Sequence, residues 1–168
     1  MTWSLPPVTT GAERRLLETM LDRNRAEVVN AVRGLSEDDA RRRLVTSLTT
    51  PIGLLKHVAV AERIWFQHVL GGLPESECDG GTKPGDASFI VGDDETVSDV
   101  IAEFERASAR SRVIAAGFDL DVIKVHPRVG DVSLRFVYLL LIEDFARHAG
   151  HGDILREQIE HPAEGDLR

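Results

Sequence analysis

The chain has 168 residues, 42% hydrophobic and 29% charged, which is enough for one domain with a proper core. Its 28 acidic residues outnumber its 20 basic ones, and the formal net charge of −8 argues against a broad nucleic-acid-binding surface. A single cysteine, Cys78, leaves no internal disulfide, and no apolar run approaches the roughly 18 residues of a membrane span. We expect one cytoplasmic domain over residues 1–168, its core in 10–160, with neither nucleic-acid nor membrane partners.

The first helix signal lies close to the N-terminus. Thr10 and Glu13 have the spacing of a capping box, and the apolar residues that follow recur at a helical period until Gly34. Ser36 offers a second cap, which predicts a short helix within residues 35–44.

A second long helix is expected over residues 52–70, where Pro51 suits the first turn because its missing N–H would be unpaired there anyway. Residues 71–95 are rich in Gly, Pro and acid, and their length is unusual for a connector. We interpret this segment as a long crossover over the helices, with residues 88–91 (SFIV) packed as a short extended piece.

The third and fourth long helices complete the expected fold. Thr96 begins the third helix, Gly117 ends it, residues 118–133 form a loop, and the fourth helix runs over 133–160. Alternation typical of a strand is confined to the letters DVIKVH in that loop. The pattern favours an all-α, antiparallel four-helix bundle, and the long crossover would allow the second and third long helices to run parallel.

Two histidines share one face of the expected last helix. His148 and His151 are three residues apart, and Asp144 precedes His148 by four, so the three side chains form one stripe. An Asp–His–His stripe is a partial ligand set for Zn²⁺ or another divalent first-row metal. The alternative is that these residues belong to a solvated face.

A rigid metal site needs a ligand from a second element, and His57 supplies one. It lies in the apolar sequence LLKHVAV, where a histidine needs either a hydrogen-bond partner or a metal. His68 is about three turns further on, roughly 16 Å away along a helix axis, and cannot join the same site. We interpret His126 and His161 as structural or solvated.

Other side chains near these positions have weaker claims. Trp65 could wall a pocket beside a metal, although packing in the core is the simpler interpretation. Arg147 could hold an anionic group of a substrate, although pairing at the surface is simpler. Cys78 lies among acidic residues that disfavour a thiolate, so we do not propose it as a nucleophile.

Two strings carry a family resemblance. TPIGLLKHVAVAERIWF (50–66) and EDFARHAGHGDILREQI (143–159) resemble the second-helix and fourth-helix motifs of the DinB-like superfamily, and the latter is closest to an actinobacterial branch. The resemblance covers about residues 10–160. It implies a four-helix bundle in up–up–down–down order, often a homodimer, with a divalent metal bound by His57, His148 and His151.

The resemblance also implies a chemistry. Characterised relatives include metal-dependent enzymes that use low-molecular-weight thiols such as mycothiol or bacillithiol, so we expect a transferase or isomerase with a thiol cosubstrate and an electrophilic substrate. Zn²⁺ is the expected metal, with Ni or Fe as alternatives. A non-catalytic metal-binding or stress-response bundle is the alternative function, and no catalytic residue is assigned.

The spacing departs from that of many superfamily members and leaves two ligand sets open. Many relatives place the last two ligands four apart, and the mycothiol isomerase branch has an acid four residues before the histidine. We favour His57, His148 and His151, with Asp144 orienting an imidazole. The alternative set is His57, Asp144 and His148.

Overall fold

The computed structural model describes residues 6–162, and this part of the chain is mostly helical with one small sheet. The predicted domain span of 1–168 includes residues 1–5 and 163–168, which lie outside the described part. Within residues 6–162, no helix is both long enough and apolar enough to cross a membrane. The elements are α1 (Glu13–Val32), α2 (Glu37–Ala40), α3 (Pro51–Glu62), η1 (Arg63–Leu70), η2 (Glu75–Glu77), η3 (Gly85–Phe89), α4 (Val97–Ala116), β1 (Ile123–His126), β2 (Gly130–Ser133) and α5 (Leu134–Glu160).

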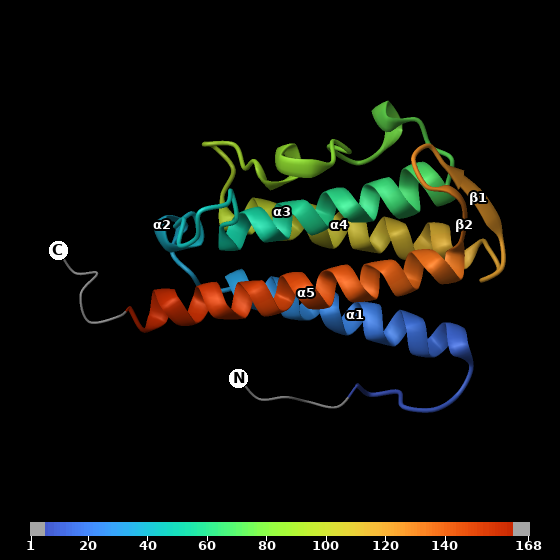
Figure 1. Ribbon diagram of the computed structural model, residues 1–168, viewed down its shortest axis with the longest axis horizontal. Helices are drawn as coiled ribbons and strands as arrows, with labels where there is room; N and C mark the ends of the chain where they lie inside the picture. Colours follow the sequence, from blue (N-terminus) through green and yellow to red (C-terminus); the bar gives the residue numbers. More distant parts are fainter. Residues whose placement is uncertain (1–5, 163–168) are drawn as a thin grey trace.

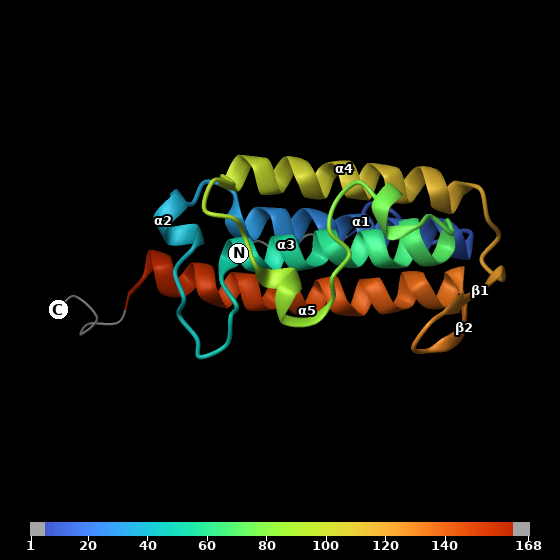
Figure 2. The ribbon, with the colours of Figure 1, turned by 90° about the horizontal axis from the view of Figure 1, so that it is seen from above.

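The four long helices lie lengthwise beside one another (Figures 1 and 2). α3 and α4 run in the same direction, as the long crossover allows, and α1 and α5 both run the opposite way (Figure 1). The order is therefore up–down–down–up, and the expected up–up–down–down order is wrong. The reason lies in the connections: residues 33–50 turn the chain at one end of α1, whereas residues 71–96 return along the whole length of α3.

Four of the described helices start with a side-chain cap, and of the two caps predicted from the sequence, the one at Ser36 is confirmed. Side chains of the residues before α2, α3, α4 and α5 accept hydrogen bonds from the first turn of each helix: Ser36, Thr50, Thr96 and Ser133. The predicted capping box of Thr10 and Glu13 is wrong. Gly11 has a φ of +121°, and α1 starts after Ala12 without a side-chain cap.

The helix expected over residues 52–70 changes its winding halfway. α3 continues directly into η1, a π-helix in which backbone hydrogen bonds reach five residues back, and the same pattern closes it at Gly71, whose N–H donates to the Phe66 carbonyl at 2.9 Å. π-Helical segments widen a helix locally and are frequent at functional sites. This wider segment carries Trp65.

The crossover after η1 packs against α3. Arg63, which is almost fully buried, pairs with Asp79 at 2.7 Å and anchors the first half of the crossover. Residues 88–91 were expected to be extended, but Ser88 and Phe89 belong to the short 3₁₀ helix η3. Gly53 allows η3 to lie close against α3, because a Cβ at this position would be only 3.0 Å from the Phe89 carbonyl oxygen.

A β-hairpin occupies the connection that was expected to be a loop, so the all-α expectation needs correction. β1 and β2 pair antiparallel, with Ile123 opposite Ser133 and His126 opposite Gly130. The β-branched alternation of Ile123 and Val125 favours a strand, and Gly130 supplies the positive φ of +84° beside the turn. The hairpin lies at the end of the molecule where α4 stops and α5 begins (Figure 1).

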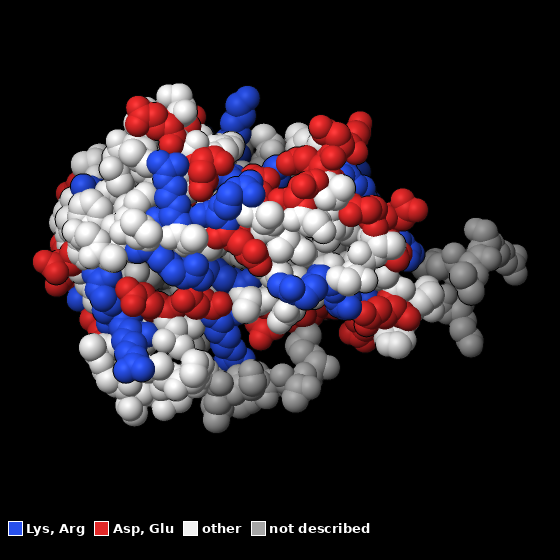
Figure 3. Space-filling view, turned by 180° about the vertical axis from the view of Figure 1, so that it is seen from behind, with Lys and Arg blue, Asp and Glu red and all other residues white. Residues whose placement is uncertain are grey.

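The hydrophobic core fills the space between the long helices. α1 and α5 approach closely at Gly152, where a Cβ would lie 2.6 Å from the Cβ of Ala31. On the face seen from behind, basic and acidic side chains are interspersed rather than gathered into a continuous basic surface (Figure 3). Ion pairs also join different elements, such as that of Arg112 on α4 with Asp22 on α1 at 2.8 Å.

Candidate metal centre

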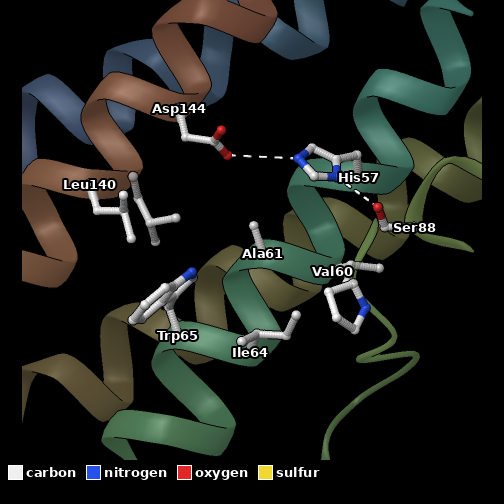
Figure 4. A pocket seen from close by; sticks show the side chains of 10 residues that line it. His57, Val60, Ala61, Ile64, Trp65, Ser88, Leu140 and Asp144 are labelled. Carbon is white, nitrogen blue, oxygen red and sulfur yellow. Dashed lines mark hydrogen bonds and ion pairs between the residues drawn. The ribbon is translucent and has the colours of Figure 1, made fainter. Parts of the chain in front are cut away.

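Three side chains from α3 and α5 converge near the middle of the molecule. His57 lies one turn after Gly53 on α3, and Asp144 and His148 lie one turn apart on α5. Each can offer one ligand atom such that all three atoms are within 4.8 Å of one another. Figure 4 shows the Asp144 carboxylate and the His57 ring pointing toward each other from facing helices.

The crossover segment fixes the orientation and tautomer of His57. Its Nδ1 lies 2.7 Å from the Ser88 hydroxyl oxygen, and that hydroxyl donates its single proton to the Gly85 carbonyl at 2.5 Å. Ser88 can therefore only accept from His57, which assigns the ring proton to Nδ1. Nε2 of His57 is left with a lone pair directed at the site.

Aromatic contacts hold the same ring from its faces and edge. Phe89 stacks on His57 with ring centroids 4.4 Å apart and an interplanar angle of 8°. The His148 ring meets it edge-on, at 4.6 Å between centroids. With Ser88 on Nδ1, these contacts allow little rotation of the His57 side chain.

The electrostatics of the site favour a neutral His57 imidazole and an ionised Asp144 carboxylate, both of which can donate electron pairs to a metal. Burial and the neighbouring His148 ring lower the pKa of His57 to about 4, although the Asp144 charge opposes them, so the ring is neutral at pH 7. Burial raises the pKa of Asp144, but the two imidazoles and Arg147 outweigh it and the pKa lies below its usual value. A carboxylate therefore faces the His57 lone pair, with Oδ2 and Nε2 3.8 Å apart.

His148 completes the group of three side chains, and within residues 6–162 one of its own ring nitrogens has no hydrogen-bond partner. Its Nε2 lies 3.4 Å from Oδ1 of Asp144, and its Nδ1 is buried with no hydrogen-bond partner among the described residues. The Nδ1 proton of His57 is held by Ser88, so His57 has no proton to offer the Asp144 carboxylate, and Nδ1 of His148 is left without a partner in the described part of the chain. Buried polar atoms without partners are costly, so this group of acceptor atoms favours binding of a ligand.

The donor set fits a divalent metal ion. Two imidazoles and one carboxylate suit Zn²⁺ and other first-row divalent cations. Ligand atoms that bind one Zn²⁺ at about 2.0–2.2 Å can be at most about 4.4 Å apart. The separations of 3.4 and 3.8 Å between the imidazoles and the carboxylate lie within that limit.

His151 lies one turn further along α5 and outside this group. Its ring centroid is 5.7 Å from that of His148, and its side chain is exposed. It lines a separate hollow of about 280 Å³ with Ser47, Thr49 and apolar residues that include Ile154. The structure thus brings together His57, Asp144 and His148, and places His151 beside them.

A cavity of about 270 Å³ opens on the other side of the metal centre. His57, Ser88 and Asp144 form its polar end, and its remaining wall is apolar: Val60, Ala61, Ile64, Trp65, Pro84, Leu140 and Leu141. Arg147 is not among the lining residues and instead pairs with Glu143 on the exposed side of α5. Of the two residues considered for a pocket, only Trp65 faces this one (Figure 4).

Sequence reasoning missed the residues that hold the site from outside. Ser88 and Phe89 lie in the Gly- and Pro-rich crossover, where no periodicity indicates which side chain faces α3. His126 stacks on Trp65, with centroids 4.7 Å apart, and thereby supports the cavity wall from β1. The strand-like alternation around His126 was the one signal that could have suggested such packing.

The other reactive side chains lie away from the centre. His68 contacts the Leu73 carbonyl through Nδ1 at 2.7 Å, which links η1 to the start of the crossover. Burial raises the pKa of the Cys78 thiol, in keeping with the expectation that it is not a nucleophile.

The fold and the site together define a class: a mostly helical protein with a group of imidazole and carboxylate side chains able to hold a divalent metal between two long helices. A family model described as mycothiol-S-transferase matches residues 16–161. The chain therefore belongs to the mycothiol S-transferase family, within the DinB-like superfamily. Sequence comparison with curated proteins gives no match.

Proposed function

We propose that this protein is a divalent-metal-dependent S-transferase that uses mycothiol, or a related low-molecular-weight thiol, against an electrophilic substrate. The observation that carries the proposal is the His57 lone pair facing the Asp144 carboxylate at 3.8 Å, inside a protein of this family. We assign the metal ligands as His57, Asp144 and His148, with Zn²⁺ as the expected ion.

This ligand set differs from the three-histidine set that we favoured from the sequence. Asp144 directs one carboxylate oxygen toward each imidazole, whereas His151 is exposed and one turn away. In this set Asp144 precedes His148 by four residues, which is the spacing of acid and histidine in the mycothiol isomerase branch. We further propose that the four long helices form a DinB-like bundle as one domain and that two copies of the chain form a homodimer.

A divalent cation bound here would lower the pKa of a coordinated thiol and so supply a thiolate at neutral pH. The chain's own residues prepare the site for it. Ser88 and Phe89 keep Nε2 of His57 directed inward, and the Asp144 carboxylate offsets positive charge. The apolar wall beside them excludes water from the place where an electrophile would react.

The test is metal content followed by turnover. Protein purified without a histidine tag should contain stoichiometric divalent metal, and a thousandfold excess of metal over its dissociation constant should raise the stability of the metal-free protein by about 4 kcal/mol. The metal-loaded protein should then transfer mycothiol to a reactive alkyl or aryl halide. No metal binding would overturn the site, and metal binding without turnover on any thiol would favour a non-catalytic metal-binding protein.

A further inference from the structure

The cavity beside the metal centre has two ends of different chemistry. At one end, His57, Ser88 and Asp144 are already engaged with one another or with the proposed metal. The rest of the wall is formed by aliphatic side chains, Pro84 and the Trp65 ring. A ligand in this cavity would therefore meet polar groups at one end and an apolar surface everywhere else.

The size of the cavity sets the size of its ligand. An apolar protein cavity of about 150 Å³ is enough to bind benzene, so about 270 Å³ accommodates one substituted ring. It is small for the pseudodisaccharide of mycothiol, and its wall offers few partners for sugar hydroxyls. Burying those hydroxyls without hydrogen bonds would be unfavourable.

Trp65 gives the wall a defined shape. His126 of β1 stacks on one face of the indole, and Phe136 of α5 meets it edge-on at 6.2 Å. These contacts come from two other elements and fix the ring against the cavity. Its nitrogen edge is turned toward the space between Asp144 and Ala61 (Figure 4), where the N–H can donate to an acceptor on a ligand.

We propose, on the basis of the transferase function above, that this cavity binds the electrophile and selects an apolar, ring-sized group, while the hydrophilic part of the thiol stays outside. The reactive carbon then lies at the polar end, beside His57 and Asp144. In the reaction, the thiol sulfur forms a bond to that carbon, the leaving group departs with the bonding electron pair, and the thiol proton passes to solvent. Leu140 and Ile64 determine which ring fits.

Two neighbouring leucines on α5 provide a matched test. Leu140 lines the cavity, whereas Leu139 is 54% exposed and lies outside its wall. The substitution Leu140→Phe should fill the cavity, and Leu139→Phe adds the same ring at the surface. Both variants are compared with the unmodified protein after loading with Zn²⁺, with metal content and melting temperature measured to confirm that they fold.

The electrophiles are 4-nitrobenzyl chloride, which carries a ring, and chloroacetamide, which does not. Leu140→Phe should lower kcat/KM for 4-nitrobenzyl chloride by about tenfold or more and leave that for chloroacetamide within about twofold. Leu139→Phe should change neither. If Leu140→Phe fails to fold, Ile64→Ala serves instead and should raise the preference for 1-(chloromethyl)naphthalene over 4-nitrobenzyl chloride.

Binding of unreactive 4-nitrobenzyl alcohol, measured by calorimetry, separates this proposal from the transferase function. Binding that Leu140→Phe abolishes, in a protein without turnover, would support the cavity assignment and overturn the transferase. Turnover whose preference for the ring is unchanged in Leu140→Phe, or in Ile64→Ala if that variant is used, would overturn the cavity assignment and leave the transferase standing.

Discussion

Two clusters of polar side chains include residues of α3, Glu62 in one and His57 in the other, and they differ in how completely they are paired. Glu62 has no exposed side-chain surface and receives two hydrogen bonds from Arg25 of α1, at 2.6 and 2.8 Å. The same guanidinium also donates to Asp22 at 2.7 Å. Five residues earlier, His57 faces Asp144 and His148, where acceptor atoms outnumber the protons available to them.

The difference indicates which cluster serves structure and which serves binding. In the Arg25 cluster, burial lowers the pKa of the guanidinium, but Glu62 and Asp22 more than compensate, so the pKa lies above its usual value. Arg112 also pairs with Asp22, at 2.8 Å, so two arginines balance the two carboxylates. That cluster needs nothing further. The metal centre of His57, Asp144 and His148 contains no arginine or lysine, and a bound divalent ion would supply the positive charge that balances its carboxylate.

Removal of His57 should have the largest effect on the metal centre. The substitution His57→Ala deletes the ligand supplied by α3, and we expect metal affinity to fall on the order of 10³-fold, because ligands from α5 alone remain. Competition with a chromophoric chelator measures the affinity. His161→Ala, at an exposed site near the end of α5, is the control. Equal affinity in the two variants would contradict the assignment.

Breaking the paired cluster should instead affect folding. Glu62→Ala leaves the Arg25 guanidinium buried without its main partner, and we expect the free energy of unfolding to fall by about 3–5 kcal/mol. Urea denaturation of the metal-free protein measures this change. The double substitution Arg25→Met with Glu62→Leu removes both charges and should recover most of the loss. A double variant as unstable as Glu62→Ala would show that the pair contributes more than charge balance.

The contact from the crossover should have an intermediate effect. Ser88→Ala removes the acceptor for Nδ1–H of His57, and we expect metal affinity to fall about 10- to 100-fold while the three ligands remain. Calorimetric titration with Zn²⁺ measures it. Ser111→Ala is the matched control, since Ser111 is a fully buried serine on α4 whose hydroxyl has no partner among the described residues. Similar affinities in the two variants would remove Ser88 from the positioning of His57.

The smallest effect is expected at His151, and it distinguishes the two ligand sets. His151→Ala should leave metal affinity within about threefold, whereas Asp144→Ala should weaken it as strongly as His57→Ala. Parallel chelator competition on the two variants gives the comparison. The reverse result, with loss of affinity in His151→Ala alone, would restore the three-histidine set.

The helices of this protein could be read from short-range signals. Ser36 caps α2 as predicted, α4 and α5 start directly after Thr96 and Ser133, where helices were expected to begin, and Pro51 occupies the first turn of α3. These interactions depend on residues three or four apart, so the sequence contains them fully. The error at Thr10 has the same local character, because the backbone at Gly11 shifts the start of α1 by a few residues.

The site was predictable only as a set of alternatives. Spacing on α5 places Asp144, His148 and His151 on one face, and the family strings add His57 from another helix. Spacing does not say which level of α5 lies opposite His57, since one helical turn displaces a side chain by about 5.4 Å along the axis. The alignment of α3 on α5 decides this, and it places Asp144 and His148 beside His57.

The sequence by itself therefore determined where the long helices lie, the cap at Ser36 and the family, because periodicity, capping and motif strings depend on residues close together in the chain. Tertiary structure decided the order of helix directions, the position of the hairpin, the contacts of Ser88 and Phe89 with His57, and the cavity lined by Trp65. Each of these depends on contacts between segments far apart in the chain. Their relative alignment is set by close packing, such as the approach of Phe89 to Gly53, rather than by local preference.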